Sequence, residues 1–330
     1  MNDLNVKDKK ILYYLEQDAR QSIRNLGKKV GLSKDVVSNR IKNLEEKGII
    51  YNYYTVINTF KLDLTILRFY IKLQYVTSEI KKEIIVYFLK NKYSNVVAAI
   101  EGSYDLVVIF TVKDIHEIYH FWEKTLDKFR DYFESYNFSL YYEEHLYDYQ
   151  FLLGNDPVEN ERMKQILSSS KEKIEIDKLD YEILSIIAPD ARIPTIEIAN
   201  KLKTTASIIH YRIKKLIDLG IILGYRTTID FSKLGLKLMK CDLFLKDHKT
   251  CNKIMKYLEK NPFLRGRDVS IGNADLEVTF FLKDISSLNN IIQDLSNKFT
   301  GAIRNYRYFI DVCLYKYVYI TKDYRDEIMI

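Results

Sequence analysis

Cysteine, proline and tryptophan are scarce in this chain of 330 residues, which contains three, four and one of them. The cysteines (Cys241, Cys251 and Cys313) form no C-x-x-C pair, and so sparse and odd a set argues against a disulfide scaffold or a zinc ribbon. Long apolar runs are also missing, since no segment approaches the roughly 20 residues of a membrane span. The N-terminal stretch MNDLNVKDKK is polar. We therefore expect a soluble, cytoplasmic protein.

Metal ligands show no convincing pattern either. His116 and His120 lie at positions i and i+4 of a predicted helix, a spacing that can hold a metal ion. No third ligand completes the set, so we predict neither a metal site nor a cofactor.

The chain does contain an internal repeat. Residues 8–64 align with 180–236 at a constant offset of 172 without a gap, which places Asp18-Ala19-Arg20 on Asp190-Ala191-Arg192. Further on, Gly102-Ser103-Tyr104-Asp105 falls on Gly272-Asn273-Ala274-Asp275 at an offset of 170. The chain therefore consists of two copies of one unit.

Basic charge is gathered near the start of each copy. The whole chain has a formal net charge of +6, yet residues 20–47 hold eight Lys or Arg against three Asp or Glu, and residues 192–226 hold seven against two. Each segment thus carries +5, and the rest of the chain is net negative. Such an excess is typical of a surface that binds a polyanion, although a solvated lysine-rich helix shows it too.

The first basic segment has the pattern of a helix-turn-helix. Apolar spacing predicts helices over 6–18 and 23–30, Gly31-Leu32 predicts a tight turn, and Ser33 predicts the N-cap of a third helix that runs to about Lys47. The apolar side of that third helix must face the other two. The alternative is a three-helix bundle that binds protein rather than DNA. The residues expected to face a DNA groove are Ser33, Lys34, Ser38, Asn39, Arg40 and Lys42.

Strand and helix patterns follow. Residues 49–57 predict a strand, the wing of a winged helix. Beyond them, we expect strands over 64–75, 96–101, 106–112 and 136–145, with helices over 78–91 and 114–129. The order β-α-β-β-α-β is the ferredoxin-like plan, which leaves one sheet face open to pair with a second copy. The predicted fold class is α+β, with two winged helix-turn-helix domains alternating with two βαββαβ domains.

This combination resembles the Lrp/AsnC family of leucine-responsive, or feast/famine, transcription regulators. The resemblance rests on Gly31-Leu32-Ser33, Arg40-Ile41, Gly48-Ile49-Ile50 and Gly102-Ser103-Tyr104-Asp105 in the first copy, and on Arg212-Ile213, Gly220-Ile221-Ile222 and Gly272…Asp275 in the second. It implies binding to double-stranded DNA and, in the ferredoxin-like domains, dimerisation and binding of an amino acid or another small molecule. The effector contacts that it implies are Gly102, Ser103, Tyr104, Asp105, Gly272, Asn273 and Asp275.

The second helix-turn-helix departs from the first where DNA would be read. Lys203 replaces Gly31, which is awkward if φ must be positive, whereas Thr205 replaces Ser33 and can still cap a helix. Its expected DNA contacts are Thr205, Ser207, His210, Tyr211, Arg212 and Lys214, and the retained basic residues include Lys215 and Arg226. We expect an asymmetric operator. The alternative is that this copy no longer reads DNA and serves only as a pseudo-dimer partner.

The domain boundaries that we expect follow the repeat. They are 1–60 and 177–234 for the helix-turn-helix domains, 61–153 and 235–322 for the ferredoxin-like domains, and 154–176 for a polar linker. The linker is long enough to let the second sheet fold back onto the first. We therefore predict a pseudo-dimer within one chain and, because of its open faces and aromatic residues, a homodimer or a higher assembly.

Two other functions remain open at this point. Siroheme decarboxylase subunits share this build and pair unlike halves, and such chemistry needs cationic anchors for tetrapyrrole carboxylates. The arginines available for that role are Arg265, Arg267, Arg304 and Arg307, of which the first two should share one strand face. An architectural DNA binder without an effector is the third possibility, with weak sequence preference and steep salt dependence. The interpretation that we carry forward is a regulator that is not an enzyme.

Overall fold

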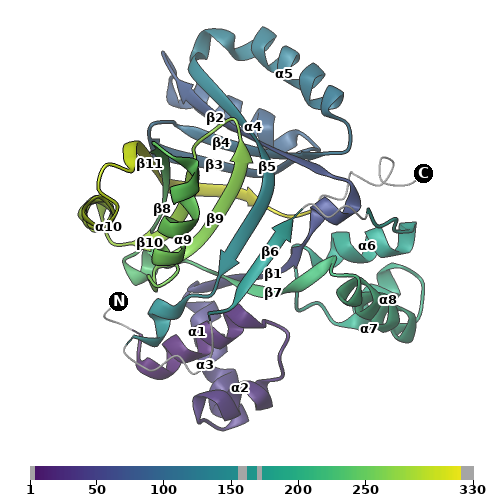
Figure 1. The fold of residues 1–330 in the computed structure, drawn as a ribbon. Helices are drawn as coiled ribbons and strands as arrows, with labels where there is room; N and C mark the ends of the chain where they lie inside the picture. The colour runs from purple at the N-terminus through teal and green to yellow at the C-terminus, as the bar shows by residue number, and fades with distance from the viewer. Residues whose placement is uncertain (1–3, 155–161, 169–172, 321–330) are drawn as a thin grey trace.

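The computed structural model describes residues 4–154, 162–168 and 173–320. Each copy contains three helices, one strand and then a βαββαβ unit, so the fold class is α+β (Figure 1). The outer ends of the domains predicted at 1–60 and 235–322, and parts of the predicted linker, lie outside the described residues. Within the described ranges, no helix is both long and apolar enough to cross a membrane.

The first helix-turn-helix has the three helices that the sequence predicts, α1 (Val6–Gln17), α2 (Ile23–Val30) and α3 (Lys34–Glu46). Ser33 caps α3 by accepting a hydrogen bond from the backbone N–H of Val36, and Gly31 has a φ of 66°, as the tight turn requires. The apolar side of α3 is buried in the lobe's core through Val37, Ile41 and Leu44. Local sequence patterns therefore predicted this lobe correctly.

The second lobe repeats the arrangement with α6 (Lys178–Ile187), α7 (Thr195–Lys201) and α8 (Ala206–Asp218). Thr205 caps α8 through the backbone N–H of Ile208. Lys203 has a φ of 52°, so this lysine occupies the left-handed conformation that Gly31 occupies in the first copy. That conformation costs a residue with a Cβ atom roughly 1–2 kcal/mol.

The strands that follow the two lobes pair with each other. β1 (Ile50–Ile57) and β7 (Ile222–Ile229) form an antiparallel two-stranded sheet, here called the ribbon, in which Tyr53 lies opposite Thr227. The strand predicted over 49–57 is present, but its partner is the other copy and it is not a free wing. The reason is its burial, since its last four residues are fully covered and need a packing partner.

Each ferredoxin-like unit has the predicted order of elements. In the first copy these are β2 (Thr65–Leu73), α4 (Ser78–Lys90), β3 (Ser94–Gly102), β4 (Leu106–Val112), α5 (Ile115–Phe129) and β5 (Phe133–Tyr147). In the second they are β8 (Lys237–Leu245), α9 (Cys251–Leu258), β9 (Leu264–Ile271), β10 (Leu276–Leu282), α10 (Ile285–Lys298) and β11 (Ile303–Tyr317). Short 3-10 helices lie at Thr59–Leu62, Arg130–Tyr132, Gln150–Leu153, Phe231–Leu234 and His248–Thr250.

The two four-stranded sheets join edge to edge and close into a barrel. β3 pairs with β11 and β5 pairs with β9 across the copies, while β5 also pairs with β2. The strands thus run β2-β4-β3-β11-β8-β10-β9-β5 and return to β2. This confirms the predicted pseudo-dimer within one chain. The face expected to be open is the inside of this barrel.

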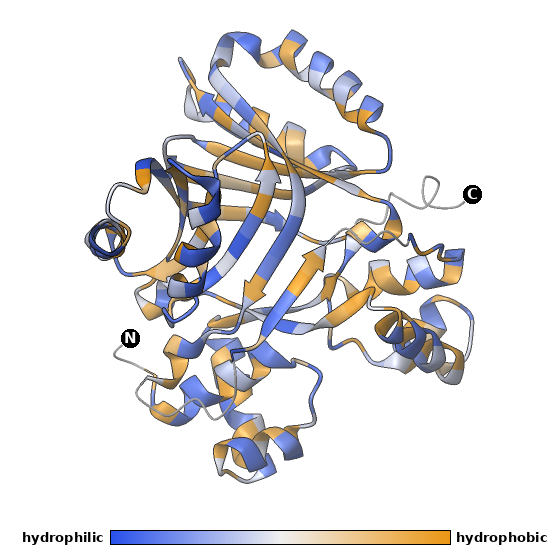
Figure 2. Cartoon of the chain, viewed as in Figure 1, coloured by the Kyte–Doolittle hydropathy of each residue, from blue (hydrophilic) through white to orange (hydrophobic). Residues whose placement is uncertain are grey.

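The outer and inner sides of the barrel strands carry different kinds of residues. Outside the strands, apolar side chains pack under α4 and α5 in one copy and under α9 and α10 in the other. Inside, several strands carry charged residues, and Figure 2 shows blue segments interrupting orange ones on strands such as β9. The buried charged groups of the barrel strands are Arg68, Asp242 and Glu277.

The predicted linker contains structure of its own. β6 (Lys164–Ser168) adds to β5 as an antiparallel strand. Before it, Arg162 forms an ion pair with Asp148 (3.2 Å) and donates hydrogen bonds to the carbonyl oxygens of Glu259, Asn261 and Leu264. The description of 154–176 as a simple linker is therefore wrong for residues 162–168, which fasten the joint to both copies.

Candidate nucleic-acid interface and barrel cavity

The exposed side of α3 is polar and basic. Lys34, Ser38, Asn39 and Lys42 are exposed, whereas Ser33 uses its hydroxyl oxygen as the helix cap. Lys42 makes only a distant ion pair with Glu46 (3.7 Å) in which both side chains remain largely in solvent. Such an exposed pair is worth little, so the ammonium group stays available to a phosphate.

Arg40 differs from this expectation. Its guanidinium forms an ion pair with Asp8 of α1, with 2.8 Å between Nη1 and Oδ1, and its side chain is 31 % exposed. In the second copy, Arg212 pairs with Asp180 (3.1 Å) and with Asp177. The arginine in each recognition helix thus fastens that helix to the first helix of its lobe, because three-helix packing brings an acidic residue opposite it.

The exposed side of α8 carries different side chains from that of α3. Ser207, His210, Tyr211 and Lys214 are exposed, and Thr205 caps the helix. Tyr211 has 66 % of its surface in solvent, so an aromatic side chain stands where Asn39 stands in the first copy. Lys215 is exposed as well, but its ammonium group lies 3.5 Å from Asp180.

Arg226 does not lie on the DNA-facing surface at all. It is 1 % exposed, forms an ion pair with the buried Glu16 of α1 and donates to the carbonyl oxygen of Tyr147 (2.7 Å). Burial lowers the pKa of its guanidinium to about 9. Its inclusion among the retained basic residues was wrong because the ribbon turns this side chain inward, and the second lobe therefore presents less basic charge than its sequence suggests.

The ribbon holds each lobe to the strand of the other copy. Thr227 of β7 donates a hydrogen bond to the carbonyl oxygen of Leu15 in the first lobe (3.0 Å), and Thr55 of β1 donates to that of Ile187 in the second (2.6 Å). Both hydroxyls are buried. Thr227 is the counterpart of Thr55 in the repeat, and Ile187 is the counterpart of Leu15, so the two contacts are equivalent.

Backbone hydrogen bonds and cation–π contacts also join each lobe to the ribbon strand of the other copy. The N–H of Ala19 donates to the carbonyl oxygen of Tyr225, and the N–H of Ala191 donates to that of Tyr53, both at 2.8 Å. Two arginines of the lobes lie over tyrosine rings of these strands: Arg20 over Tyr225 at 5.1 Å and Arg192 over Tyr53 at 3.9 Å. The ribbon therefore fixes the positions of both recognition helices relative to the barrel.

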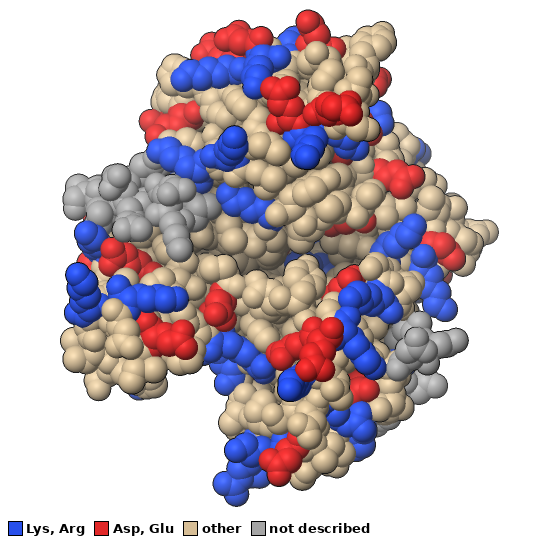
Figure 3. Space-filling view, turned by 180° about the vertical axis from the view of Figure 1, so that it is seen from behind, with Lys and Arg blue, Asp and Glu red and all other residues tan. Residues whose placement is uncertain are grey.

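The two lobes remain separate bodies on the surface. Figure 3 shows them below the barrel with a notch between them, and Lys and Arg are mixed with Asp and Glu over this face. No uninterrupted basic patch covers the side of the molecule seen there.

The glycines predicted as effector contacts lie at the two seams of the barrel, which are the strand pairs β3–β11 and β5–β9 where the two copies meet. Gly102 has a φ of 126°, and a Cβ atom there would approach the carbonyl oxygen of Tyr308 to 2.6 Å. Gly272 has a φ of 96° and would meet the carbonyl oxygen of Phe138 at 3.0 Å. Close approach of the other copy's strand therefore explains both glycines.

The remaining turn residues are engaged with neighbouring strands. Asp105 accepts a hydrogen bond from the backbone N–H of Leu73 (2.8 Å), and Asp275 accepts one from that of Leu245 (2.7 Å). Asn273 donates to Asp242 (2.9 Å). Tyr104 stacks on Tyr70 with 5.1 Å between ring centroids, and Ser103 remains exposed. These contacts hold each turn to a neighbouring strand of its own copy.

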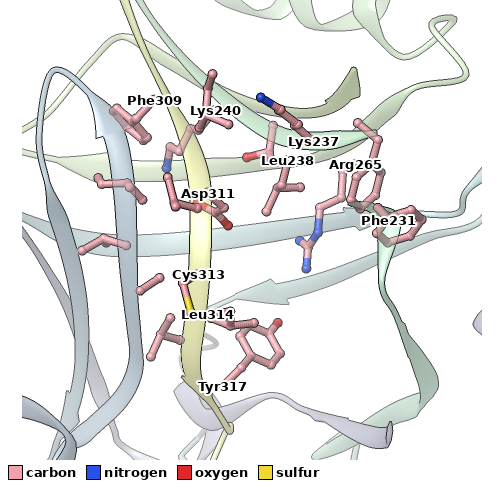
Figure 4. A pocket seen from close by; sticks show the side chains of 18 of the residues that line it. Phe231, Lys237, Leu238, Lys240, Arg265, Phe309, Asp311, Cys313, Leu314 and Tyr317 are labelled. Carbon is pink, nitrogen blue, oxygen red and sulfur yellow. The ribbon is translucent and has the colours of Figure 1, made fainter. Parts of the chain in front are cut away.

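A cavity of about 670 Å³, which the sequence did not reveal, lies between the inside of the barrel and the ribbon (Figure 4). Arg68, Lys240 and Asp268 of its lining form a network with Glu277 behind them: Arg68 contacts Asp268 (3.0 Å) and Glu277 (2.5 Å), and Lys240 contacts the same two carboxylates. Burial alone would raise the pKa of Glu277, but Arg68 and Lys240 hold it well below its usual range. One feature of the sequence could have indicated this network: Arg68 and Lys240 are cations at equivalent positions of the two copies, in apolar strands.

Arg265 and Arg267 do not share a strand face. A bulge in β9 between the partners of Thr279 and Phe280 leaves Arg265 unpaired with β10. Arg265 consequently lines the cavity and lies 3.7 Å from Glu144, whereas Arg267 donates to Cys251 Sγ at the start of α9. Burial raises the pKa of Glu144 to about 7.

The other two arginines of that predicted cluster also lie elsewhere. Arg304 is 58 % exposed in its side chain, and Arg307 pairs with Asp242 (3.0 Å) and reaches the hydroxyl of Tyr104 (3.3 Å). The expected arginine cluster is therefore not assembled around one cavity.

Comparison with known proteins identifies the class to which the two lobes belong. A family model described as winged helix-turn-helix DNA-binding matches residues 4–51 and again 176–222. The chain is 36 % identical over 114 residues to the HTH-type transcriptional regulator Ptr1 of Methanocaldococcus jannaschii, covering 34 % of this chain and 74 % of the relative. It is 30 % identical over 129 residues to LrpA of Pyrococcus horikoshii, covering 39 % and 92 %.

The chain belongs to the Lrp/AsnC family. The Haemophilus influenzae regulatory protein AsnC is 31 % identical over 119 residues, with 36 % of this chain and 79 % of that protein covered. A shorter match, 45 % identical over 65 residues, spans 44 % of an uncharacterised HTH-type regulator from Pyrococcus furiosus.

The solved structure of the siroheme decarboxylase NirDL has the same fold over nearly the whole chain. Its TM-score is 0.63 at 12 % sequence identity, and the match covers 97 % of this chain and 96 % of that one. At that identity, the likeness concerns the fold alone.

Proposed function

We propose that this protein is a DNA-binding transcription regulator that places α3 and α8 on one duplex in a fixed relation. The observation that carries the proposal is the reciprocal attachment through the ribbon, in which Thr227 holds the first lobe and Thr55 holds the second. Helix-turn-helix proteins commonly achieve a fixed pair of recognition helices by dimerising. Here, one chain supplies both.

The two helices read different sequences. α3 offers Lys34, Ser38 and Asn39, which suit phosphates and hydrogen-bonding base edges, while α8 offers His210 and Tyr211, of which the tyrosine suits the methyl group of thymine. The operator is consequently asymmetric, with two unlike half-sites. Selection from a random duplex pool tests this, and recovery of a perfect inverted repeat would contradict it.

Charge reversal tests DNA binding directly. Lys34→Glu with Lys42→Glu should reduce duplex affinity at least tenfold at 100 mM salt and flatten the dependence of log K on log salt, because two phosphate contacts are lost. The matched control is Lys82→Glu with Lys90→Glu on α4, which makes the same charge change on an exposed helix outside the barrel. Equal affinity of both double variants would end the proposal.

A small-molecule effector is part of the proposal. The candidate contacts remain Gly102, Ser103, Tyr104, Asp105, Gly272, Asn273 and Asp275 at the two seams. Footprinting on the chain's own promoter with and without a panel of amino acids tests this. Uniform weak protection with a steep salt dependence would instead indicate an architectural DNA binder.

A tetrapyrrole-acting enzyme is the second candidate, and the fold of NirDL, solved with an iron-uroporphyrin III analogue, favours it. Against it, Arg265 alone of the four predicted anchors lines the cavity. A strong absorbance change on adding iron-uroporphyrin III, lost in Arg265→Gln, would establish this alternative. We expect no such change.

A further inference from the structure

The cavity inside the barrel brings together residues of both copies and of the ribbon. Arg68 comes from β2, Lys240 from β8, Arg265 from β9 and Asp311 from β11, while Tyr51 and Thr228 come from the two ribbon strands. At about 670 Å³, it falls within the range of roughly 300–1,000 Å³ that is typical of small-molecule pockets.

The cations in its wall already have partners. Arg68 and Lys240 share the carboxylates of Asp268 and Glu277, and Arg265 lies beside Glu144. An anionic ligand would have to displace one of these internal carboxylates, and the remaining charged residues would then be left unbalanced. The wall therefore does not favour an anion.

Asp311 is the exception among the half-buried charged groups of the cavity. No ion pair or side-chain hydrogen bond joins it to any of the described residues, and Figure 4 shows it on β11 within the cavity. Burial raises the pKa of its carboxyl to about 6, in spite of Arg265 and Lys240, which lower it. At pH 7.5, the group is therefore ionised and partly withdrawn from water, and Arg265 and Lys240 act on it without forming an ion pair with it, which is unfavourable.

The cavity also has apolar and aromatic lining residues. Phe309 precedes Asp311 on the same strand, β11, and Leu238, Tyr70 and Tyr141 contribute from other strands. We propose that this cavity binds an organic amine whose ammonium group pairs with Asp311 and whose apolar or aromatic body packs against these walls. The sequence alone gave no indication of this site, which is distinct from the turns at the two seams.

The ribbon gives ligand binding a route to the DNA-reading lobes. Tyr51 and Tyr54 of β1 and Thr228 of β7 line the cavity, next to the threonine that holds the first lobe. A ligand in the cavity thus contacts the strands that position both recognition helices. This second step rests on the proposed DNA-binding function, whereas amine binding itself does not.

Calorimetric titration of the full chain with tyramine, agmatine and spermidine at pH 7.5 tests the site. At least one amine should bind, and Asp311→Asn should weaken that binding at least tenfold while Asp311→Glu restores part of it. Asp127→Asn, on the exposed surface of α5, is the matched control and should bind as the wild type does. Circular dichroism melting verifies that each variant is folded.

The anion 4-hydroxyphenylacetate separates charge recognition from general aromatic binding, because it matches tyramine in size but carries the opposite charge. Binding of this acid as tightly as tyramine would overturn the proposal. So would the failure of all three amines at millimolar concentration, or unchanged amine binding in Asp311→Asn.

Cys313 provides a readout of location. It is exposed and lines the same cavity, whereas Cys241 and Cys251 are buried. A bound amine should slow alkylation of Cys313 several-fold in the wild type and not in Asp311→Asn. If binding and protection hold but operator affinity is the same with and without amine, the site stands and its link to DNA is refuted.

Discussion

Arg40 of α3 forms an ion pair with Asp8 of α1, and Arg212 of α8 forms the equivalent pair with Asp180 of α6 at the corresponding positions of the second copy. The repetition of both partners shows that the arginine of each recognition helix is tied to its own lobe. In the first copy, the charges are 31 % and 16 % exposed, so solvent screens part of their attraction.

We expect this pair to contribute to stability and little to DNA affinity. A double-mutant cycle with Arg40→Gln and Asp8→Asn should give a coupling free energy of roughly 0.5–1 kcal/mol in urea unfolding. The slope of log K against log salt for DNA should remain as in the wild type. A slope reduced as strongly as by Lys34→Glu would show instead that Arg40 contacts a phosphate.

The ribbon contacts predict crossed effects on the lobes. Thr227→Val removes the hydrogen bond to Leu15, leaves a buried carbonyl oxygen without that donor and should cost about 1 kcal/mol. Hydrogen exchange should accelerate in α1, which belongs to the other copy. Thr55→Val is the matched variant and should accelerate exchange in α6, because its partner is Ile187.

Exchange that accelerates in α6 after Thr227→Val, with α1 unaffected, would contradict the reciprocal attachment. General acceleration throughout the chain would indicate global destabilisation, and a second measurement at lower temperature would then separate local from global opening.

The left-handed backbone conformation of Lys203 predicts that glycine at this position stabilises the protein. Its φ of 52° lies where glycine has no steric penalty, so Lys203→Gly should raise the free energy of unfolding by roughly 0.5–1 kcal/mol. Urea unfolding measures the change. Lys214→Gly, in the middle of α8, is the control and should lower stability by about 1 kcal/mol. Loss of stability in Lys203→Gly would mean that the lysine side chain makes a compensating contact.

Asp311 predicts a pH dependence of stability. Because burial raises the pKa of its carboxyl to about 6 from an ordinary value of 3.8, the folded state holds this proton more tightly than the unfolded state does. Its contribution to stability is therefore lost as the pH rises from about 4 through 6. Other charged side chains also line the cavity. They are the acids Glu101, Glu144, Asp230 and Asp268 and the bases Arg68, Lys237, Lys240 and Arg265. The titratable hydroxyls and thiol of the lining belong to Tyr51, Tyr54, Tyr70, Tyr141, Tyr149, Tyr317 and Cys313.

Asp311→Asn should consequently be more stable than the wild type at pH 8 by about 1 kcal/mol, a figure reduced for partial solvent exposure, and equal to it near pH 4. Urea unfolding at both pH values, with Asp127→Asn as the control, measures the gap. A gap of the same size at both pH values would show that Asp311 does not titrate in this range.

Patterns that depend on neighbouring residues were predictable. The caps Ser33 and Thr205, the turn at Gly31 and the buried stripe of α3 all follow from residues within one or two helical turns of each other. The βαββαβ order was equally accessible. Arg226 was not, because its burial depends on the pairing of β7 with β1 and on Glu16 from the other copy.

The cavity, like the burial of Arg226, could not be predicted from local sequence patterns. Arg68 and Lys240 can be recognised in the sequence as unusual cations in apolar strands, but their shared partners come from β9 and β10. The bulge that turns Arg265 into the cavity also arises only when β9 meets its neighbours. Strand pairing, both within the second copy and across the copies, therefore determines which charges meet.

The duplication, the helix-turn-helix lobes and their exposed polar faces were determined by the sequence itself, because helix periodicity and capping act over a few residues. Tertiary structure decided three other features: the closure of the barrel, the attachment of each lobe to the ribbon strand of the other copy, and the charged cavity. Those features depend on strand register between segments that lie in different copies, far apart along the chain, and no local pattern specifies it.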